Sequence, residues 1–305
     1  MIFFSVIIPS YNRAQMLVKA VTSVIEQTFH EWEVIIVDDG STDDTAEKIK
    51  RIAKYDQRIR YTFQRNAERS VARNNGIAQA KGKYICFLDS DDKFEPNRLQ
   101  LMHDKIAASK YPEAVFYTAI RFYHREQEIF IKDPGPVTGN IFDFLYKAVI
   151  GTPQLCIHHS LLAKESFNPN LIIGEDFELL MRLAHLAPFK YLSEQATVIA
   201  NEHGGRTADL SESYLKHIEM LSNVLKMHKS FFSDSRVPKK FMHDALLGLA
   251  RSYATEKRIR KMNYTIFQAC SYSLTYNLKE KIVLILLHNS IFIPFKLFYR
   301  RWLKK

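Results

Sequence analysis

Three aspartates, Asp89, Asp91 and Asp92, directly follow the apolar run YICFL at residues 84–88. Like charges this close repel one another and favour the unfolded chain unless a positive charge compensates them. Mg²⁺ and Mn²⁺ prefer oxygen ligands, and proteins hold them with one or two carboxylates plus substrate phosphates. The spacing therefore indicates a site for a divalent metal and a diphosphate. The alternative is that these acids only cap the following helix.

Two further loops end apolar runs in the same way. The turn PSYN at residues 9–12 follows the run SVII, and Asp38 and Asp39 follow the run VIIV. In an open parallel sheet, ligands bind outside the carboxyl ends of the strands. We therefore expect three loops from separate strands to converge on one crevice, two of them acidic.

The elements that carry these loops alternate along the first half of the chain. Continuous apolar runs of strand length, such as FFSVIIP and EVIIVDD, are separated by segments with helical periodicity. Such runs are typical of parallel strands covered on both faces, and the alternation predicts an α/β fold with a doubly wound, mostly parallel sheet flanked by helices. We expect a further helix over 97–107 and one strand over 114–124.

After Gly204 and Gly205 the pattern changes to basic helical segments, which places a boundary near residue 205. Residues 206–305 hold 19 Lys and Arg against 7 Asp and Glu, so the net charge of +10 comes from this region. A basic region suggests an anionic membrane face or nucleic acid, or simply a solvated helical surface. The three widely spaced cysteines indicate reduced thiols and a cytoplasmic location.

The order and spacing of several segments resemble the family 2 glycosyltransferases, which have the GT-A fold. The resemblance is carried by SVIIPSYN at 5–12, VIIVDDGSTDDT at 34–45 and ARNNGIAQAKGKYICFLDSDD at 72–92. It covers residues 4–105 closely and extends more weakly, through GEDFELLMRL and EHGGRT, to about residue 207. The family implies a nucleotide-sugar donor, a divalent metal and inversion at the anomeric carbon. Residues 1–205 would then be the GT-A catalytic domain, followed by the basic, mainly helical region 206–305.

Carried over by position, the resemblance implies roles for the residues at the strand ends. Pro9 and Tyr11 would line the base pocket, with UDP the expected nucleotide. Asp39 would accept a hydrogen bond from the base, and Arg73 would contact the nucleotide. At the end of the fourth strand, Asp89 would lie near the ribose and the donor sugar. Asp91 would be a ligand of Mn²⁺ or Mg²⁺ with Asp89 beside it, and Asp92 would lie close by.

The segment IIGEDFELL carries the residues expected to act on the acceptor. Glu175 and Asp176 open a helix, where the dipole favours carboxylates, so capping alone would explain them. The resemblance implies instead that Asp176 is the general base and that Glu175 helps to orient the acceptor. Displacement at an anomeric carbon needs such a group, because the attacking hydroxyl must lose its proton.

The segment NEHGGRTAD is the third place where the resemblance implies ligand contacts. His203 would complete the metal site, and Arg206 would contact the diphosphate. The alternative for a lone histidine is a structural role. The adjacent glycines suit a loop that closes over a donor.

Residues 281–305 combine six basic residues, no acid and several aromatic residues. This composition is typical of a segment that lies on an anionic membrane, as a lipid-linked saccharide acceptor would require. The protein would then be peripheral at the inner face of the cell membrane. The alternative is a helix packed on the catalytic domain or on a partner subunit in a homodimer.

Other classes of protein fit the sequence less well. The turn after the first strand contains no glycine, which disfavours a nicotinamide-binding dehydrogenase and a nucleotidyltransferase with a Gly-rich loop. A non-catalytic binder of nucleotide sugars stays an alternative. Bases and aromatic residues are not interleaved on strands, so no nucleic-acid partner is expected.

Overall fold

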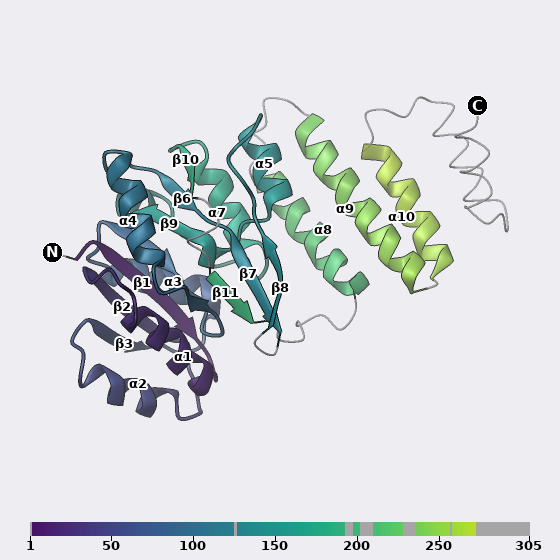
Figure 1. Cartoon of the computed structure of the whole chain (residues 1–305). Helices are drawn as coiled ribbons and strands as arrows, with labels where there is room; N and C mark the ends of the chain where they lie inside the picture. The colour runs from purple at the N-terminus through teal and green to yellow at the C-terminus, as the bar shows by residue number, and fades with distance from the viewer. Residues whose placement is uncertain are drawn as a thin grey trace. The chain divides into compact units, whose positions relative to one another are not determined.

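The computed structural model describes residues 2–124, 127–192, 198–201, 210–227, 236–256 and 258–272. The chain divides into two compact units, Met1–Gly205 and Arg206–Lys305. Figure 1 shows the first unit as a mixed α/β structure and the second as a set of helices. The first unit contains nearly all of the residues that the sequence analysis singles out, so its fold decides which of them can act together.

A seven-stranded sheet forms the centre of the first unit, in the order β10-β6-β9-β4-β1-β2-β3. Its strands are β1 (Phe4–Ser10), β2 (Trp32–Asp38), β3 (Ile59–Phe63), β4 (Tyr84–Phe87), β6 (Val115–Tyr117), β9 (Leu155–His158) and β10 (Phe189–Tyr191). Strands β4, β1, β2 and β3 run parallel, as do β10 and β6, while β9 is antiparallel to both of its neighbours. The predicted mostly parallel α/β sheet is confirmed.

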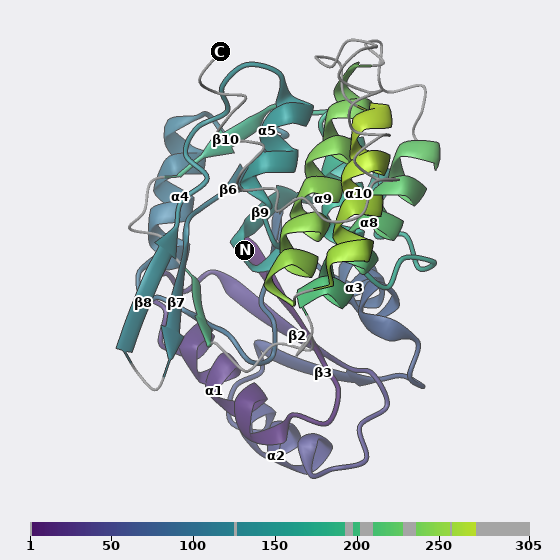
Figure 2. The same cartoon turned by 90° about the vertical axis from the view of Figure 1, so that its right-hand side faces the viewer.

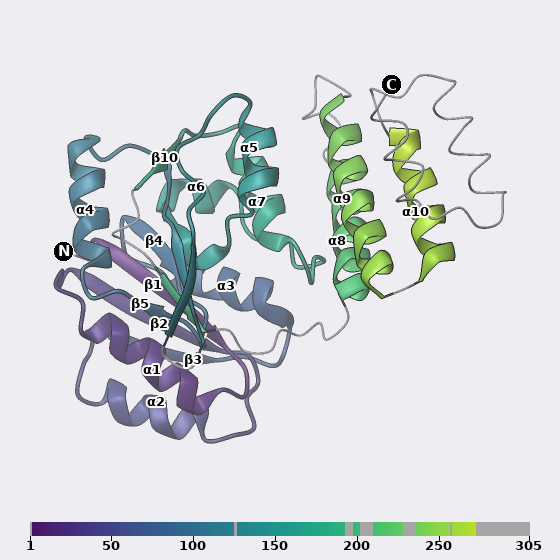
Figure 3. The same ribbon diagram turned by 45° about the vertical axis from the view of Figure 1, so that its right-hand side comes forward.

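Helices cover both faces of this sheet (Figure 3), which explains why its strands are continuous apolar runs. They are α1 (Ala14–Ile25), α2 (Thr45–Ala53), α3 (Glu68–Gln79), α4 (Arg98–Ala108), α5 (Ile141–Ala148), α6 (His159–Lys164) and α7 (Glu175–Leu183). The side chains of β1 point alternately to the two faces of the sheet. Val6 and Ile8 join the core formed with α1, α2 and α4, while Ile7 faces Gly76 of α3. A Cβ on Gly76 would lie 2.5 Å from the Ile7 side chain, so only glycine allows this approach.

A second, four-stranded sheet corrects one expectation. Its order is β5-β11-β7-β8, with β5 (Lys93–Phe94), β11 (Val198–Asn201), β7 (Ile120–His124) and β8 (Gln127–Lys132). The single strand expected over 114–124 is therefore two strands, β6 and β7, in different sheets. The buried guanidinium of Arg98 donates to Thr118 Oγ1 at 2.8 Å and to the Pro153 carbonyl at 2.9 Å, which fixes the chain where it changes sheet.

The second unit contains three helices among its described residues: α8 (Leu210–Met227), α9 (Arg236–Thr255) and α10 (Ile259–Tyr272). Figure 2 shows α9 and α10 side by side, and buried side chains such as Leu221, Phe241 and Ala269 form their core. Of the helices that can be described, none combines the length and apolar character needed to cross a membrane. Residues 281–305, on which the predicted membrane contact depends, lie outside the described residues.

Candidate active site

The loops after β1 and β2 are joined by hydrogen bonds around Asn12. The Asn12 amide donates to Ser41 Oγ at 2.9 Å, and the Thr42 amide donates to Asn12 Oδ1 at 2.8 Å. Asn12 adopts a φ of 51°, which asparagine tolerates better than most residues. This pairing presents Tyr11 to solvent with 48% of its surface exposed, beside the half-buried Pro9. The two predicted base-pocket residues therefore lie together at the end of β1.

Asp39 lies at the end of β2, buried to 5% exposure. Its Oδ1 accepts hydrogen bonds from Gln64 Nε2 at 2.6 Å and from the Ala67 amide at 2.8 Å. Its backbone amide donates to the Ser10 carbonyl at 2.8 Å, which ties it to the end of β1. Among the described residues Oδ2 has no such donor, so this oxygen can accept a hydrogen bond from a ligand.

Two arginines compensate the negative charge of the aspartates that follow β4. Arg73 Nη2 donates to Asp89 Oδ1 at 2.9 Å, and Arg13 forms an ion pair with Asp91. The side chains of Asp89 and Asp91 remain 37% and 22% exposed, whereas Asp92 is buried in the turn. Arg13 is a residue of this cluster that the sequence did not predict. Its position directly after the first-strand turn, facing an acidic loop, is the signal that could have found it.

The start of α7 brings the predicted acceptor residues to the same region. Gly174 precedes the helix with a φ of 74°, and Glu175 follows it, buried. Arg73 Nη1 donates to Glu175 Oε1 at 2.9 Å, so the one guanidinium binds both Asp89 and Glu175. Arg69 lies 3.5 Å from the same oxygen. The structure thus connects the end of β4 to the first turn of α7 through α3.

The rest of α3 holds the segment that leads into α7. Asn74 Nδ2 donates to the Phe167 carbonyl at 2.8 Å, and the Phe167 amide donates back to Asn74 Oδ1 at 2.9 Å. Ser70 Oγ donates to the Leu171 carbonyl at 3.3 Å. These contacts fix the segment before α7, and with it the position of Asp176 relative to the strand ends.

Asp176 carries the electrostatic signature of a base. Burial, and next the negative charge of Glu175, raise its pKa from 3.8 to about 6, while Arg73 and Arg69 oppose that rise. Its Oδ1 accepts from the Phe177 amide at 2.7 Å. A carboxylate with a pKa near 6 accepts a proton more readily than an ordinary aspartate and is still ionised near neutral pH.

The donor set at the end of β4 suits a hard divalent cation. Asp89 and Asp91 offer partly exposed carboxylate oxygens, the ligands that Mn²⁺ and Mg²⁺ prefer. Within the part of the chain that the structure describes, no group of three His, Cys, Asp or Glu side chains could hold a metal ion by itself. A diphosphate would therefore have to supply further ligands, and the expectation that His203 completes the site stays a prediction.

Two further predicted site residues, His203 and Arg206, lie outside the described residues. Only 2% of the Arg73 side chain is exposed, and both of its terminal nitrogens are bound to carboxylates. The expectation that Arg73 contacts the nucleotide therefore stays a prediction.

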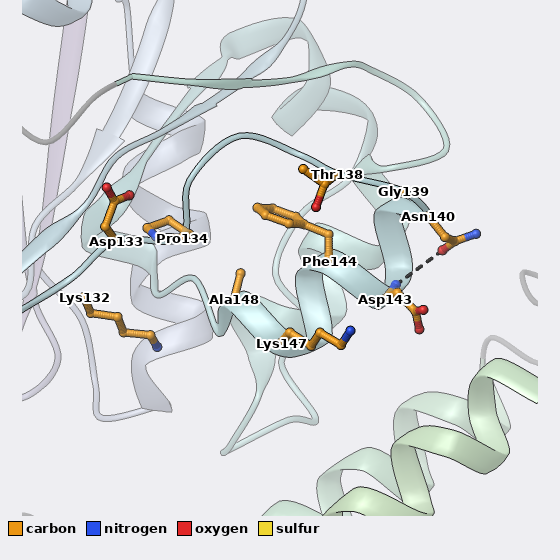
Figure 4. A pocket seen from close by; sticks show the side chains of 10 residues that line it. All are labelled: Lys132, Asp133, Pro134, Thr138, Gly139, Asn140, Asp143, Phe144, Lys147 and Ala148. Carbon is orange, nitrogen blue, oxygen red and sulfur yellow. Dashed lines mark hydrogen bonds between the residues drawn. The ribbon is translucent and has the colours of Figure 1, made fainter. Parts of the chain in front are cut away.

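Two cavities lie beside these residues. One, of about 460 Å³, is lined by the first turn of α1, including Arg13, and by Asp43 and Asp44. The other, of about 520 Å³, lies between the end of β8, the following loop and α5 (Figure 4). Lys132 lines the second cavity, and the charge of Asp176 acts on its ammonium group.

Residues 5–155 match the family model for glycosyl transferase family 2. An uncharacterized glycosyltransferase of Rickettsia conorii is 37% identical over 185 residues, covering 59% of this chain and 30% of the relative. Chondroitin synthase of Escherichia coli is 30% identical over 198 residues, covering 62% of this chain and 28% of the relative. The match thus spans less than a third of the length of these relatives.

Solved structures share the fold at low identity. Residues 1–349 of Staphylococcus aureus TarS, in complex with UDP-GlcNAc, align with a TM-score of 0.60 and 19% identity, covering 88% of this chain and 81% of that one. The mannosyltransferase PcManGT of Pyrobaculum calidifontis, in complex with GDP-Man and Mn²⁺, aligns with a TM-score of 0.54 and 16% identity, covering 93% and 78%. The predicted GT-A-type fold is confirmed.

Proposed function

We propose that this chain, whose residues 5–155 match the model for glycosyl transferase family 2, moves a sugar from a nucleotide-diphosphate donor to a saccharide acceptor with inversion. The observation that carries the proposal is the link from Asp89 through Arg73 to Glu175, because it joins the carboxylates at the end of β4 to the helix that presents Asp176. The donor side and the base of a displacement reaction are thereby held by one set of contacts.

The donor would bind over the ends of β1, β2 and β4. Tyr11 is exposed for stacking on a base beside Pro9, and Asp39 Oδ2 is left to accept from a base N–H group. UDP is the nucleotide we favour, and the UDP-GlcNAc complex of the TarS fragment is consistent with it. Arg206, beyond the described residues, is our candidate for a diphosphate contact.

Asp91 and Asp89 would hold the divalent ion, with His203 as a further ligand. The Mn²⁺ in the PcManGT complex supports a metal in a protein of this fold. The ion would stabilise the negative charge on the leaving diphosphate, so no protein acid is needed there. Its charge would also replace that of Arg13 beside Asp91.

Asp176 would act as the general base. As the acceptor oxygen attacks the anomeric carbon from the face opposite the diphosphate, the O–H proton passes to the Asp176 carboxylate. The bond from the anomeric carbon to the diphosphate oxygen breaks, and its electron pair leaves with the nucleoside diphosphate. Glu175, held by Arg73 and Arg69, lies next to Asp176, and its negative charge is the second cause, after burial, of the raised pKa of Asp176.

The wider setting of the reaction is also proposed. We assign residues 1–205 as the catalytic domain and residues 206–305 as a basic helical region that brings the protein to an anionic membrane or to a second copy of the chain. A lipid-linked saccharide acceptor at the inner face of the cell membrane would suit the composition of residues 281–305. The similarity to chondroitin synthase supports a role in polysaccharide synthesis.

A thermal-shift panel tests the donor assignment, because a ligand that binds the folded state raises the melting temperature by mass action. The panel combines UDP-, GDP- and dTDP-sugars, each with Mn²⁺ and with a chelator. We expect at least one UDP-sugar to raise the melting temperature only when Mn²⁺ is present. No shift with any nucleotide sugar would contradict the proposed function.

A further inference from the structure

The cavity of about 520 Å³ beside α5 has the size and lining of a small-molecule site. Pockets for such ligands usually measure about 300–1,000 Å³ and combine an apolar surface with a few polar groups. Figure 4 shows the ring of Phe144 pointing from α5 toward the loop that carries Pro134. Around this apolar pair lie hydrogen-bonding side chains: Lys132, Asp133, Thr138, Asn140, Asp143 and Lys147. Mixed donors and acceptors around a ring suit a sugar, which carries hydroxyls on its rim and C–H groups on its faces.

Lys132 is a cation with unused hydrogen-bonding capacity at one end of this cavity. Its Nζ donates to the Val149 carbonyl at 2.7 Å, and this is its one hydrogen bond among the described residues. An ammonium group has three donors, so the others are available to a ligand. Burial lowers the pKa of Lys132, and the nearby charge of Asp176 opposes that effect. The ammonium group therefore lines the cavity and is close enough to the candidate base to feel its charge.

The short loop that directly follows α5 passes beside Asp176 and contains an uncommon backbone conformation. Val149, the residue after α5, has a φ of 48°, an uncommon value for a β-branched residue. Two residues later, a Cβ built on Gly151 would lie 4.0 Å from Asp176 Oδ2, so the backbone there passes beside the carboxylate. Strained residues cluster at ligand sites, where the surrounding structure maintains them.

We propose that this cavity binds the saccharide acceptor, with Lys132 donating to the oxygen of the sugar hydroxyl that faces Asp176. This inference rests on the proposed function and names the acceptor subsite within it. A lysine donor binds a lone pair of the hydroxyl oxygen and leaves its proton free to pass to Asp176. Pro134 and the part of Phe144 that lines the cavity would contact the C–H groups of the sugar, while Asn140 and Lys147 bind its outer hydroxyls.

Three variants test the assignment. Lys132→Met removes the ammonium group and keeps most of the side-chain stem. Ala148→Trp fills the cavity from α5. Lys105→Met, at an exposed position on α4, is the matched control. The acceptors are p-nitrophenyl glucoside, N-acetylglucosaminide and glucuronide. Each variant is assayed for transfer to these glycosides, for binding of the glycosides by saturation-transfer NMR, and for hydrolysis of the donor by water.

We expect Lys132→Met and Ala148→Trp to raise the KM for the accepted glycoside at least about tenfold and to weaken its NMR signal in proportion. Donor binding should be unchanged in both variants and in Lys105→Met. Equal KM values in wild type and both cavity variants would overturn the assignment, as would the absence of any glycoside signal in a wild type that hydrolyses the donor. A wild type that neither binds nor hydrolyses any donor would instead refute the proposed function.

Discussion

Arg73 donates a hydrogen bond to Glu175 at 2.9 Å inside the protein, where only 2% and 5% of the two side chains are exposed. The same guanidinium donates to Asp89 at the end of β4. A buried arginine between two carboxylates holds distant parts of the chain in register, because removal of any member leaves an uncompensated charge. The position of Asp89 relative to the first turn of α7, which carries Asp176, is therefore set by α3.

Replacing Arg73 alone should lower the free energy of unfolding more than replacing Arg73 and Glu175 together. Arg73→Met leaves Glu175 buried without its main partner, which typically costs about 3–5 kcal/mol. The double variant Arg73→Met with Glu175→Gln should recover part of this loss. Urea denaturation of wild type, both single variants and the double variant gives the coupling energy. Additive effects of the two substitutions would show that the pair does not interact.

Asp91→Asn should weaken metal-dependent donor binding. An amide is a poorer ligand for a hard cation than a carboxylate, so the affinity for UDP in the presence of Mn²⁺ should fall at least about tenfold. Isothermal titration with UDP, with and without Mn²⁺, measures this loss. Asp104→Asn, on an exposed part of α4, is the control and should bind as wild type does. Wild-type affinity in Asp91→Asn would remove this residue from the metal site.

The raised pKa of Asp176 makes the stability of the wild type depend on pH. A carboxyl whose pKa is raised from 3.8 to about 6 on folding stabilises the folded state below pH 3.8, and this contribution is lost as the pH rises through 6. Asp176→Asn carries no such charge. The free energy of unfolding of the variant, relative to that of the wild type, should therefore increase as the pH rises from about 4.5 to about 7.5, by at most about 3 kcal/mol. Urea midpoints of both proteins at these pH values check it; a difference independent of pH would contradict the raised pKa.

Val149→Gly should stabilise the fold. Glycine adopts a positive φ without strain, and Val149 is 59% exposed, so little buried surface is lost. We expect the free energy of unfolding to increase by about 1 kcal/mol, by analogy with other glycines after a helix end. Val149→Ala keeps the Cβ and should gain less. Thermal melts of the two variants against wild type decide the matter, and a lower melting temperature for Val149→Gly would argue against strain at this position.

The sequence predicted the sheet and the strand-end loops because parallel strands leave a strong local signal. Val6, Ile7 and Ile8 are all apolar because both faces of β1 are covered, and the acids after β4 stand out against such a run. The change of sheet within 114–124 left no such signal, since Thr118 and Ala119 fit a strand as well as a bend. It depends on Arg98, which lies far from them in sequence.

The candidate site was predicted residue by residue but not as a network. Asp89, Arg73 and Glu175 could each be identified from the sequence. The contact between Arg73 and Glu175, however, spans 102 positions and depends on how α3 packs. The ion pair of Arg13 with Asp91 and the electrostatic effect of Asp176 on Lys132 likewise follow from packing. Tertiary contacts of this kind leave no periodicity or spacing in a single sequence.

In the proposed reaction Asp176 takes the acceptor proton, and other residues bind the donor. The decisive experiment measures the turnover of Asp176→Asn on its best nucleotide sugar, together with the affinity for that donor on the same preparation. We predict a turnover about 10²–10⁴-fold below wild type, with donor affinity unchanged. Turnover within a few fold of wild type would show that Asp176 is not the base, because the neighbouring carboxylate, Glu175, is held by Arg73 and Arg69.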